Sequence, residues 1–263
     1  MRAGVSGRAR RLDRLGVFIK LFMDAAETIR DAVARVAALQ QTSATQPTLA
    51  AAIADVKRFQ SRRFALTYAN ELTGGPYQGA SRFFLDELYS DKDYAQRDAQ
   101  FSRIANALQT MFPKHVVATA VALAQLHALT EGLDHAMGLA WLTADDQPSE
   151  VARYVAVWRA VGRPEDRDAQ LSSVVRVGQE LDRLTRAPGL RLLLKMMRRP
   201  AQAAGLSALQ SFLEAGFDTF AAMSGRGEGA RIFLALIQER ENSLIRDLFD
   251  ADVVALETKL RGL

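Results

Sequence analysis

The 263-residue chain contains no cysteine. This absence excludes disulfides, thiolate zinc sites, iron–sulfur clusters and a cysteine nucleophile. It fits a reducing cytoplasm, which is where we expect the protein to reside. Charge of one sign is also scarce, because the formal net charge is only +4 and the first 35 residues, with eight basic and four acidic side chains, account for all of it. A balance of this kind does not predict nucleic-acid binding.

Complete catalytic and metal motifs are missing as well. The sequence has no G-x-S-x-G, no H-E-x-x-H and no pair of Glu-x-x-His motifs. The glycine-rich segments "TGGPYQG" and "SGRGEG" lack the Lys-Ser/Thr of a phosphate loop. Asp91 and Asp93 begin like a calcium loop, but Ala95 and Gln96 stand where a ligand and a glycine are required. Motifs therefore predict no catalytic residues and no metal site.

Hydrophobic runs are short for a membrane span. The longest uncharged core-like run, residues 115–130, falls below the roughly 20 residues that a spanning helix needs. Near the N-terminus, Lys20 interrupts the apolar run and no small-residue cleavage site follows. We therefore expect no transmembrane segment.

Almost every long segment has hydrophobic residues at the 3.6-residue period, and runs of alternating β-branched residues are absent. This pattern predicts an all-α protein, a multi-helix bundle of about nine helices with a long N-terminal amphipathic helix. The segment "QQTSATQP", Gln40–Pro47, has the composition of a linker. We therefore divide the chain into an N-terminal amphipathic helix with its linker, residues 1–45, and a single helical-bundle domain, residues 46–263.

The N-terminal helix has a continuous apolar seam. Leu15, Phe22 and Ile29 belong to it, and neighbouring apolar positions widen it beyond a two-stranded coiled-coil seam. We expect these three side chains to be buried, at roughly 1.5–3 kcal/mol each, against the bundle or in a homodimer. Binding of a protein partner through the same face stays open.

The stretch "RFFLDELYSDKDYAQRDAQFSRI" combines aromatic, acidic and arginine residues. Ser90 followed three residues later by Asp93 resembles a capping box, which predicts a turn between two helices. The apolar stripe of the second helix lacks one turn, and that turn contains Arg97 and Asp98. We predict that at least one of these two side chains points inward and pairs with another helix, in a structural polar role.

Three segments resemble an uncharacterised family of proteobacterial all-helical proteins: "FFLDELY", "RDAQFSRI" and "LHALTEGLD". The likeness extends from "RFALTYANEL" through "LEAGFDTF". Members of that family usually have Gly after "LY", where this chain has Ser90, and this difference affects only a turn. The resemblance implies a bacterial origin and an all-helical fold, and it supplies no activity.

His127 is the histidine most distinctive in its setting, because residues 116–129 are apolar nearly all round. The simplest interpretation is a core histidine hydrogen-bonded to a neighbour. Glu131, one turn away, is the nearest candidate, and Asp98 or Arg97 from the preceding helix could compete with it. The alternatives are a cofactor site at His127 and Glu131, holding haem or a metal, and an enzyme that uses Arg97, Asp98, His127 and Glu131. We expect His127 to be substantially buried near at least one acidic side chain, with no open cavity large enough for haem beside it. A ligand-sized pocket containing His127 and a carboxylate would favour the alternatives.

The sequence thus favours a non-enzymatic interaction or regulatory module, because that function needs only apolar seams and surfaces. The identity of any cofactor is open. One basic segment, Arg183–Pro200, has six basic and no acidic residues. We interpret it as a core helix with a solvated basic face, with contact to acidic lipid or an acidic partner as the alternative.

Overall fold

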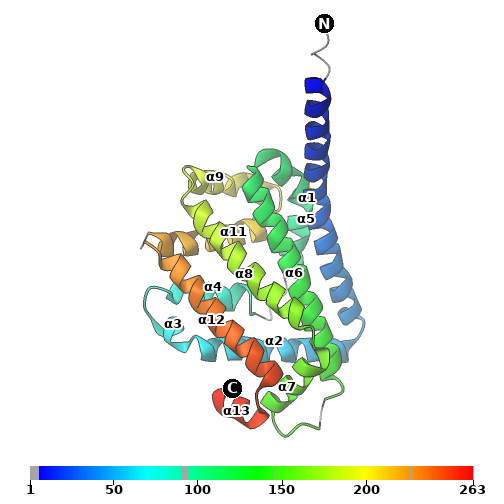
Figure 1. The fold of residues 1–263 in the computed structure, drawn as a ribbon, viewed down its shortest axis with the longest axis vertical. Helices are drawn as coiled ribbons and strands as arrows, with labels where there is room; N and C mark the ends of the chain where they lie inside the picture. The colour runs from blue at the N-terminus through cyan, green and yellow to red at the C-terminus, as the bar shows by residue number, and fades with distance from the viewer. Residues whose placement is uncertain (1–5, 91–93, 145, 226, 263) are drawn as a thin grey trace.

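The structure, a computed structural model, describes the backbone of residues 6–90, 94–144, 146–225 and 227–262. Side chains within the helices are described from Ala25 onward, except at Met111. All regular structure in these ranges is helical (Figure 1), which confirms the all-α prediction. The helices are α1 (Ser6–Ala44), α2 (Pro47–Thr67), α3 (Ala69–Thr73), α4 (Gln78–Glu87), α5 (Ala95–Met111), α6 (Lys114–Trp141), α7 (Glu150–Val161), α8 (Pro164–Thr185), α9 (Leu190–Met196), α10 (Arg198–Ala203), α11 (Ser207–Ser224), α12 (Gly229–Asp250) and α13 (Val253–Lys259).

The expected number of about nine helices was too low. The additional elements in the described ranges are short helices, among them α3, α10 and α13, of five to seven residues each. Helices this short contain too few turns to produce a recognisable hydrophobic period. The core helix predicted in Arg183–Pro200 is wrong in its extent and burial, because α9 covers only Leu190–Met196 and contains no buried residue. The long segments were predicted well, since α6 follows Pro113 and Pro164 lies in the first turn of α8.

The linker predicted at Gln40–Pro47 is wrong in its first half, because α1 continues to Ala44. Thr42 and Ser43 donate their hydroxyls to the carbonyls of Ala38 and Leu39, so these polar residues are satisfied without leaving the helix. The break is confined to the residues just before Pro47, which begins α2.

The described half of the α1 seam packs against α5 and α6. Ile29 is fully buried in a small cluster with Ala26, Ala32, Ala105 and Ala124. Alanine at four of these five positions allows the three helix backbones to approach closely. The prediction for Ile29 is therefore confirmed, whereas the side chains of Leu15 and Phe22 lie outside the described residues.

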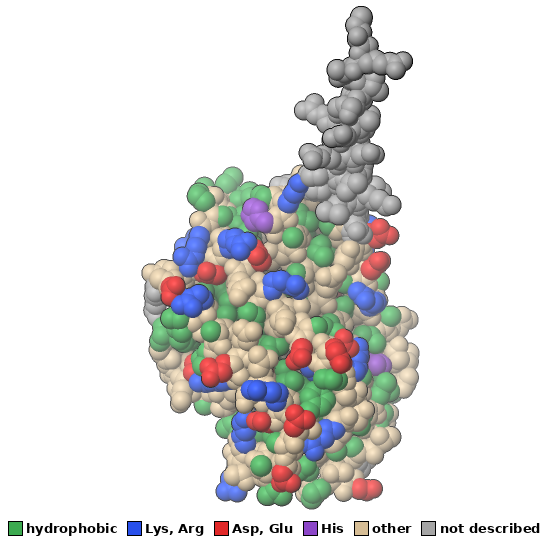
Figure 2. All heavy atoms as spheres, in the orientation of Figure 1, with side chains coloured by type: hydrophobic (Ala, Val, Ile, Leu, Met, Phe, Trp, Pro, Cys, Tyr) green, Lys and Arg blue, Asp and Glu red, His purple; other side chains and the backbone are tan. Residues whose placement is uncertain are grey.

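Helix α6 is the centre of the bundle, in contact with α1, α2, α5, α7 and α8. In Figure 1, α8 runs obliquely beside it, α12 lies on the other side of α8, and α2 crosses its lower part. Among the described helices, α6 is the one whose length and apolar composition would suffice for a membrane span. Positive and negative side chains are interspersed over the face of the protein shown in Figure 2.

A close crossing of α2 and α6 depends on Gly138. A Cβ atom at this position would lie 2.3 Å from Ile53 Cγ1 and 3.3 Å from the Ile53 backbone. We expect Gly138→Ala to lower the free energy of unfolding by ~1–3 kcal/mol, because the crossing has no room for a methyl group. Denaturant unfolding would measure the change.

Gly132, on the same helix, is the matched control. A Cβ atom there meets nothing within 4 Å. Gly132→Ala should therefore raise stability by about 0.5–1 kcal/mol through helix propensity alone. Equal effects of the two alanine variants would contradict the close crossing.

Candidate functional site

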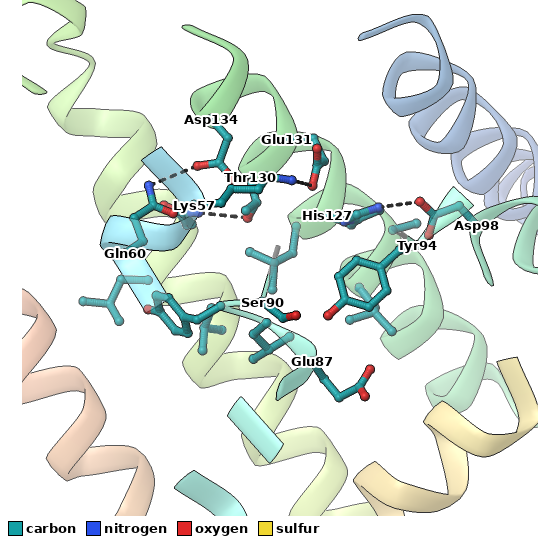
Figure 3. Close-up of a pocket in the computed structure, with 18 of the residues that line it drawn as sticks. Lys57, Gln60, Glu87, Ser90, Tyr94, Asp98, His127, Thr130, Glu131 and Asp134 are labelled. Carbon is teal, nitrogen blue, oxygen red and sulfur yellow. Dashed lines mark hydrogen bonds and ion pairs between the residues drawn. The ribbon is translucent and has the colours of Figure 1, made fainter. Parts of the chain in front are cut away.

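A cavity of about 150 Å³ lies inside the bundle, where α2, α5, α6 and α8 meet the segment between α4 and α5 (Figure 3). A cavity of this volume is large enough to hold a molecule the size of benzene. Its wall is unusual for a protein interior because charged side chains from several helices line it. Three groups of these side chains have separate roles.

The first group centres on His127 of α6. Its Nε2 atom lies 2.8 Å from Asp98 Oδ2 on α5. Asp98 is buried, and Arg97 Nε lies 3.8 Å from its other carboxylate oxygen. The inward, interhelical pairing predicted for Arg97 or Asp98 is therefore confirmed for Asp98.

Arg97 is held by its surroundings on several sides. Its guanidinium lies over the rings of Tyr94 and Phe212, at 3.9 and 4.5 Å, and Nη1 donates to Glu87 at 3.3 Å. These contacts fix the planar group at the edge of the cavity. Arg97 thereby connects α5 to α4 and α11.

The turn before α5 differs from the predicted capping box. The helix begins at Ala95, and its N-cap is Tyr94, whose side chain makes no cap hydrogen bond. The Tyr94 hydroxyl instead donates to the Asp86 carbonyl and ties the corner together. Ser90 therefore does not start this helix, and Asp93 lies outside the described residues.

The second group joins α2 to α6. Lys57 Nζ lies 2.7 Å from Glu131 and 4.0 Å from Asp134, and Gln60 donates to Asp134 at 3.1 Å (Figure 3). Burial lowers the pKa of Lys57, but the nearby Asp134 and Glu131 carboxylates outweigh burial and raise that pKa above its ordinary value of 10.5. Glu131 is thus the partner of Lys57, and Asp98 is the partner of His127.

Asp134 carries an electrostatic cost in this group. Burial raises its pKa above the ordinary value of 3.8, and the attraction of Lys57 offsets only part of that rise. The folded chain therefore holds this proton at pH values where the unfolded chain has released it. Stability contributed by the group is lost as pH rises from about 3.8 through the raised pKa.

We expect Asp134→Asn to melt at a higher temperature than the wild-type protein at pH 7, because the amide removes the buried charge and can still accept from Gln60. The difference in melting temperature between the variant and the wild-type protein should become smaller as pH falls toward 4, where the native carboxyl is protonated. Thermal melts between pH 4 and 8 would measure it. A variant that is less stable than wild type at pH 7 would contradict a net cost at Asp134.

The third group is a buried ion pair. Arg63 Nη1 of α2 lies 2.6 Å from Glu241 Oε1 of α12, and the Tyr68 hydroxyl donates to the same oxygen at 3.0 Å. The other Glu241 oxygen lies 3.5 Å from the Tyr89 hydroxyl. Burial, followed by the charge of Glu241, raises the pKa of both Tyr68 and Tyr89. This network fixes α2 to α12 at the wall of the cavity.

Arg167, in the first part of α8, has a different environment. It is 3% exposed and lines the cavity, yet its Nε and Nη2 atoms have no hydrogen-bond partner. Its guanidinium lies 3.9 Å from the centre of the Trp158 ring. Burial lowers the pKa of Arg167, and the charges of Tyr154 and Asp134 oppose that change only in part.

The structure brings together only part of the residue set predicted from sequence. Arg97, Asp98 and His127 form one contiguous unit, whereas Glu131 belongs to the neighbouring lysine cluster. A benzene-sized cavity is much smaller than a haem. No group of three or more His, Asp or Glu side chains is placed to hold a metal within the described part of the chain.

Sequence reasoning missed Arg63, Arg167 and Glu241. Two of them interrupt apolar stripes in the same way as Asp98: Arg63 follows Val56 and Phe59 on α2, and Glu241 lies between buried positions of α12. That signal could have identified both. Arg167 lies among acidic residues in a first turn, where a solvated position is the ordinary expectation.

A family model described as "Domain of unknown function (DUF8198)" matches residues 39–254 of the chain. The match covers α2 to α12 and every charged side chain of the cavity. No curated protein and no solved structure matches the chain.

Proposed function

The chain belongs to the DUF8198 family, and we propose that it is a ligand-binding module whose central cavity holds a small molecule with an acidic group. The proposal keeps the non-enzymatic function favoured by the sequence and replaces a protein partner with a small molecule. A ligand-sized pocket that contains both His127 and Asp98 is the reason for this change.

The observation that carries the proposal is the guanidinium of Arg167, whose buried Nε and Nη2 atoms have no hydrogen-bond partner. A buried arginine is normally paired, because an unsatisfied buried donor costs about 1–3 kcal/mol and an isolated buried charge costs more. The cavity wall contains three other basic side chains of α2 and α5, and each has a carboxylate within 4.0 Å. Among the described residues of this wall, Arg167 is the basic side chain without one.

A carboxylate or phosphate in the cavity would supply what Arg167 lacks. Arginine presents two parallel N–H groups that match such oxygens. Around it, Gln170 and Thr130 are hydrogen-bonded to each other at 2.8 Å, and the Lys57 and His127 clusters offer further polar atoms. A polar head group with one acidic end suits this wall.

Binding can be tested with a panel of acids. Acetate, succinate, N-acetylglycine and inorganic phosphate would be added to the full chain in thermal-shift and calorimetric titrations, with N-acetylglycinamide as the neutral match for N-acetylglycine. We expect at least one acid to raise the melting temperature saturably, because a ligand that binds only the folded state stabilises it. The amide should have no effect. If no acid in the panel raises the melting temperature, the proposal fails.

Acid–base chemistry on the bound molecule is the second candidate. The 2.8 Å contact between His127 and Asp98 favours it, because a carboxylate that orients an imidazole is a common arrangement for proton transfer. Prolonged incubation of the acids with the protein, followed by NMR, tests the candidate. Conversion that is lost in Asp98→Asn would support it, and unchanged probes would count against it.

A further inference from the structure

A second cavity, of about 270 Å³, lies farther along the same helices. Its wall is almost entirely apolar, with phenylalanine and leucine side chains of α4, α5, α8 and α11. The polar exceptions, Thr119 and Gln210, are already bonded, to the carbonyls of His115 and Leu194. An apolar molecule in this cavity would therefore leave no hydrogen-bonding group of the wall unsatisfied.

The two cavities share a wall. Phe101, Leu126, Val174 and Phe212 line both of them. Phe212 also touches the guanidinium of Arg97, so the boundary between the polar and the apolar space lies beside that arginine. A ligand that extended past these side chains would occupy both cavities.

Three helices show the same change from charged to apolar side chains along their length. Helix α8 presents Arg167 to the polar cavity and Val177 and Leu181 to the apolar one. Along α5, the lining side chains also change from charged to apolar from Asp98 toward the C-terminus. Along α6, which runs the other way, they change from charged to apolar from Asp134 toward the N-terminus. The pair of cavities is thus polar at one end and apolar at the other.

An apolar void of this size is not an ordinary feature of a protein core. Cores are packed like organic crystals, with few voids larger than a water molecule, and an empty cavity lowers stability in proportion to its volume. An engineered apolar cavity of roughly 150 Å³ binds benzene. The larger cavity here has room for a flexible apolar chain.

We infer that the ligand is amphipathic: an acyl chain in the apolar cavity, joined by an amide or ester to an amino-acid-sized acidic head in the polar cavity. The inference rests on the proposed function, because Arg167 binds the acid. Val174 follows Arg167 by seven residues, or roughly 10 Å along the helix. A plain fatty acid would place methylenes beside Lys57 and Asp98 over that distance, whereas an amide-linked head would place polar atoms there.

The outer wall of the apolar cavity is consistent with an apolar occupant. Leu190 and Leu194 of α9 face the cavity, while Leu192 and Met196 of the same helix are 63% and 66% exposed. Figure 2 shows hydrophobic and basic side chains together at this end of the molecule. Helix α9 therefore turns leucine side chains toward the cavity and exposes Leu192 and Met196 to solvent beside Arg191 and Lys195.

Three probes distinguish the contribution of the acidic head from that of the acyl chain: N-acetylglycine, N-decanoylglycine and decanol. Each would be titrated calorimetrically into the full-length protein below its micelle concentration. We expect N-decanoylglycine to bind at least tenfold more tightly than N-acetylglycine, because each buried methylene strengthens binding about fourfold. Equal affinities of the two acids would overturn this inference and leave the proposed function standing. Binding of decanol as tight as that of N-decanoylglycine would count against the head-group assignment and so against both proposals.

A variant of the apolar wall tests whether the acyl chain occupies this cavity. Val177 lines only the apolar cavity, and Val177→Phe fills part of it. The variant should lose most of the tenfold advantage of N-decanoylglycine over N-acetylglycine. Val254→Phe, at a position that is 67% exposed on α13, is the matched control and should keep that advantage. Circular dichroism would establish that both variants fold, and an unchanged advantage in a folded Val177→Phe protein would contradict the inference.

Discussion

Glu241→Ala is expected to lower the free energy of unfolding by ~3–5 kcal/mol, the largest effect among the substitutions considered. The reason is that the substitution removes the partner of Arg63, which is 7% exposed and bonded to Glu241 at 2.6 Å. Without the carboxylate, Arg63 would be an uncompensated buried charge. Tyr68 would also lose the acceptor of its hydroxyl. Urea unfolding of the variant and the wild-type protein would measure the loss.

The neighbouring pair between Arg62 and Glu150 gives a matched control. Their side chains are 47% and 43% exposed, so solvent screens the pair. Arg62→Ala should change stability by only about 0–1 kcal/mol. Similar losses in Arg62→Ala and Glu241→Ala would contradict the buried character of the Arg63–Glu241 pair.

Arg167→Met is expected to act in the opposite direction on the unliganded protein and raise its stability by about 1–3 kcal/mol. The variant removes two buried donors that have no partner, each costing about 1–3 kcal/mol, and loses a contact with the Trp158 ring worth roughly 0.5–2 kcal/mol. Methionine keeps the unbranched shape of the side chain. The same variant should lose the melting-temperature increase that an acidic ligand produces.

This combination distinguishes a binding arginine from a structural one. A structural arginine stabilises the fold, so its replacement lowers stability whether or not ligand is present. The hydrogen-bond donors of a binding arginine are satisfied only by the ligand. Its removal therefore raises the stability of the unliganded protein and weakens ligand binding. A destabilised Arg167→Met protein that still responds to acids would contradict the assignment of Arg167.

Much of the fold could be predicted from hydrophobic periodicity. The long helices produce several turns of pattern, and prolines at positions 113 and 164 indicate where α6 and α8 begin. Short helices such as α3 and α10 produce too little pattern to recognise. The end of α1 was misplaced because Thr42 and Ser43 have loop-like composition, although their side chains bond to the preceding helical turn.

The candidate site could be predicted only where a polar residue interrupts an apolar stripe. That signal identified Asp98, and the apolar helix around His127 identified the imidazole. The sequence offered two kinds of partner for the imidazole, Glu131 on its own helix and Asp98 or Arg97 on the preceding one. Periodicity could not select Asp98, because Glu131 is closer in sequence and yet bonds Lys57. The cavity itself is a product of how α5, α6 and α8 pack, which one-dimensional periodicity does not encode.

The central claim, that Arg167 binds the acidic group of a ligand, is tested most directly by NMR of its side-chain Nε–H group. Its resonance can be assigned by its absence from spectra of Arg167→Met. We predict that this resonance moves downfield and saturates as N-decanoylglycine is added, and stays unchanged with the neutral N-decanoylglycinamide. The carboxylate offers two charged oxygens to the parallel N–H groups of Arg167, whereas the amide offers a single neutral carbonyl. An Arg167 resonance that does not move at concentrations where N-decanoylglycine saturates other signals would contradict the claim.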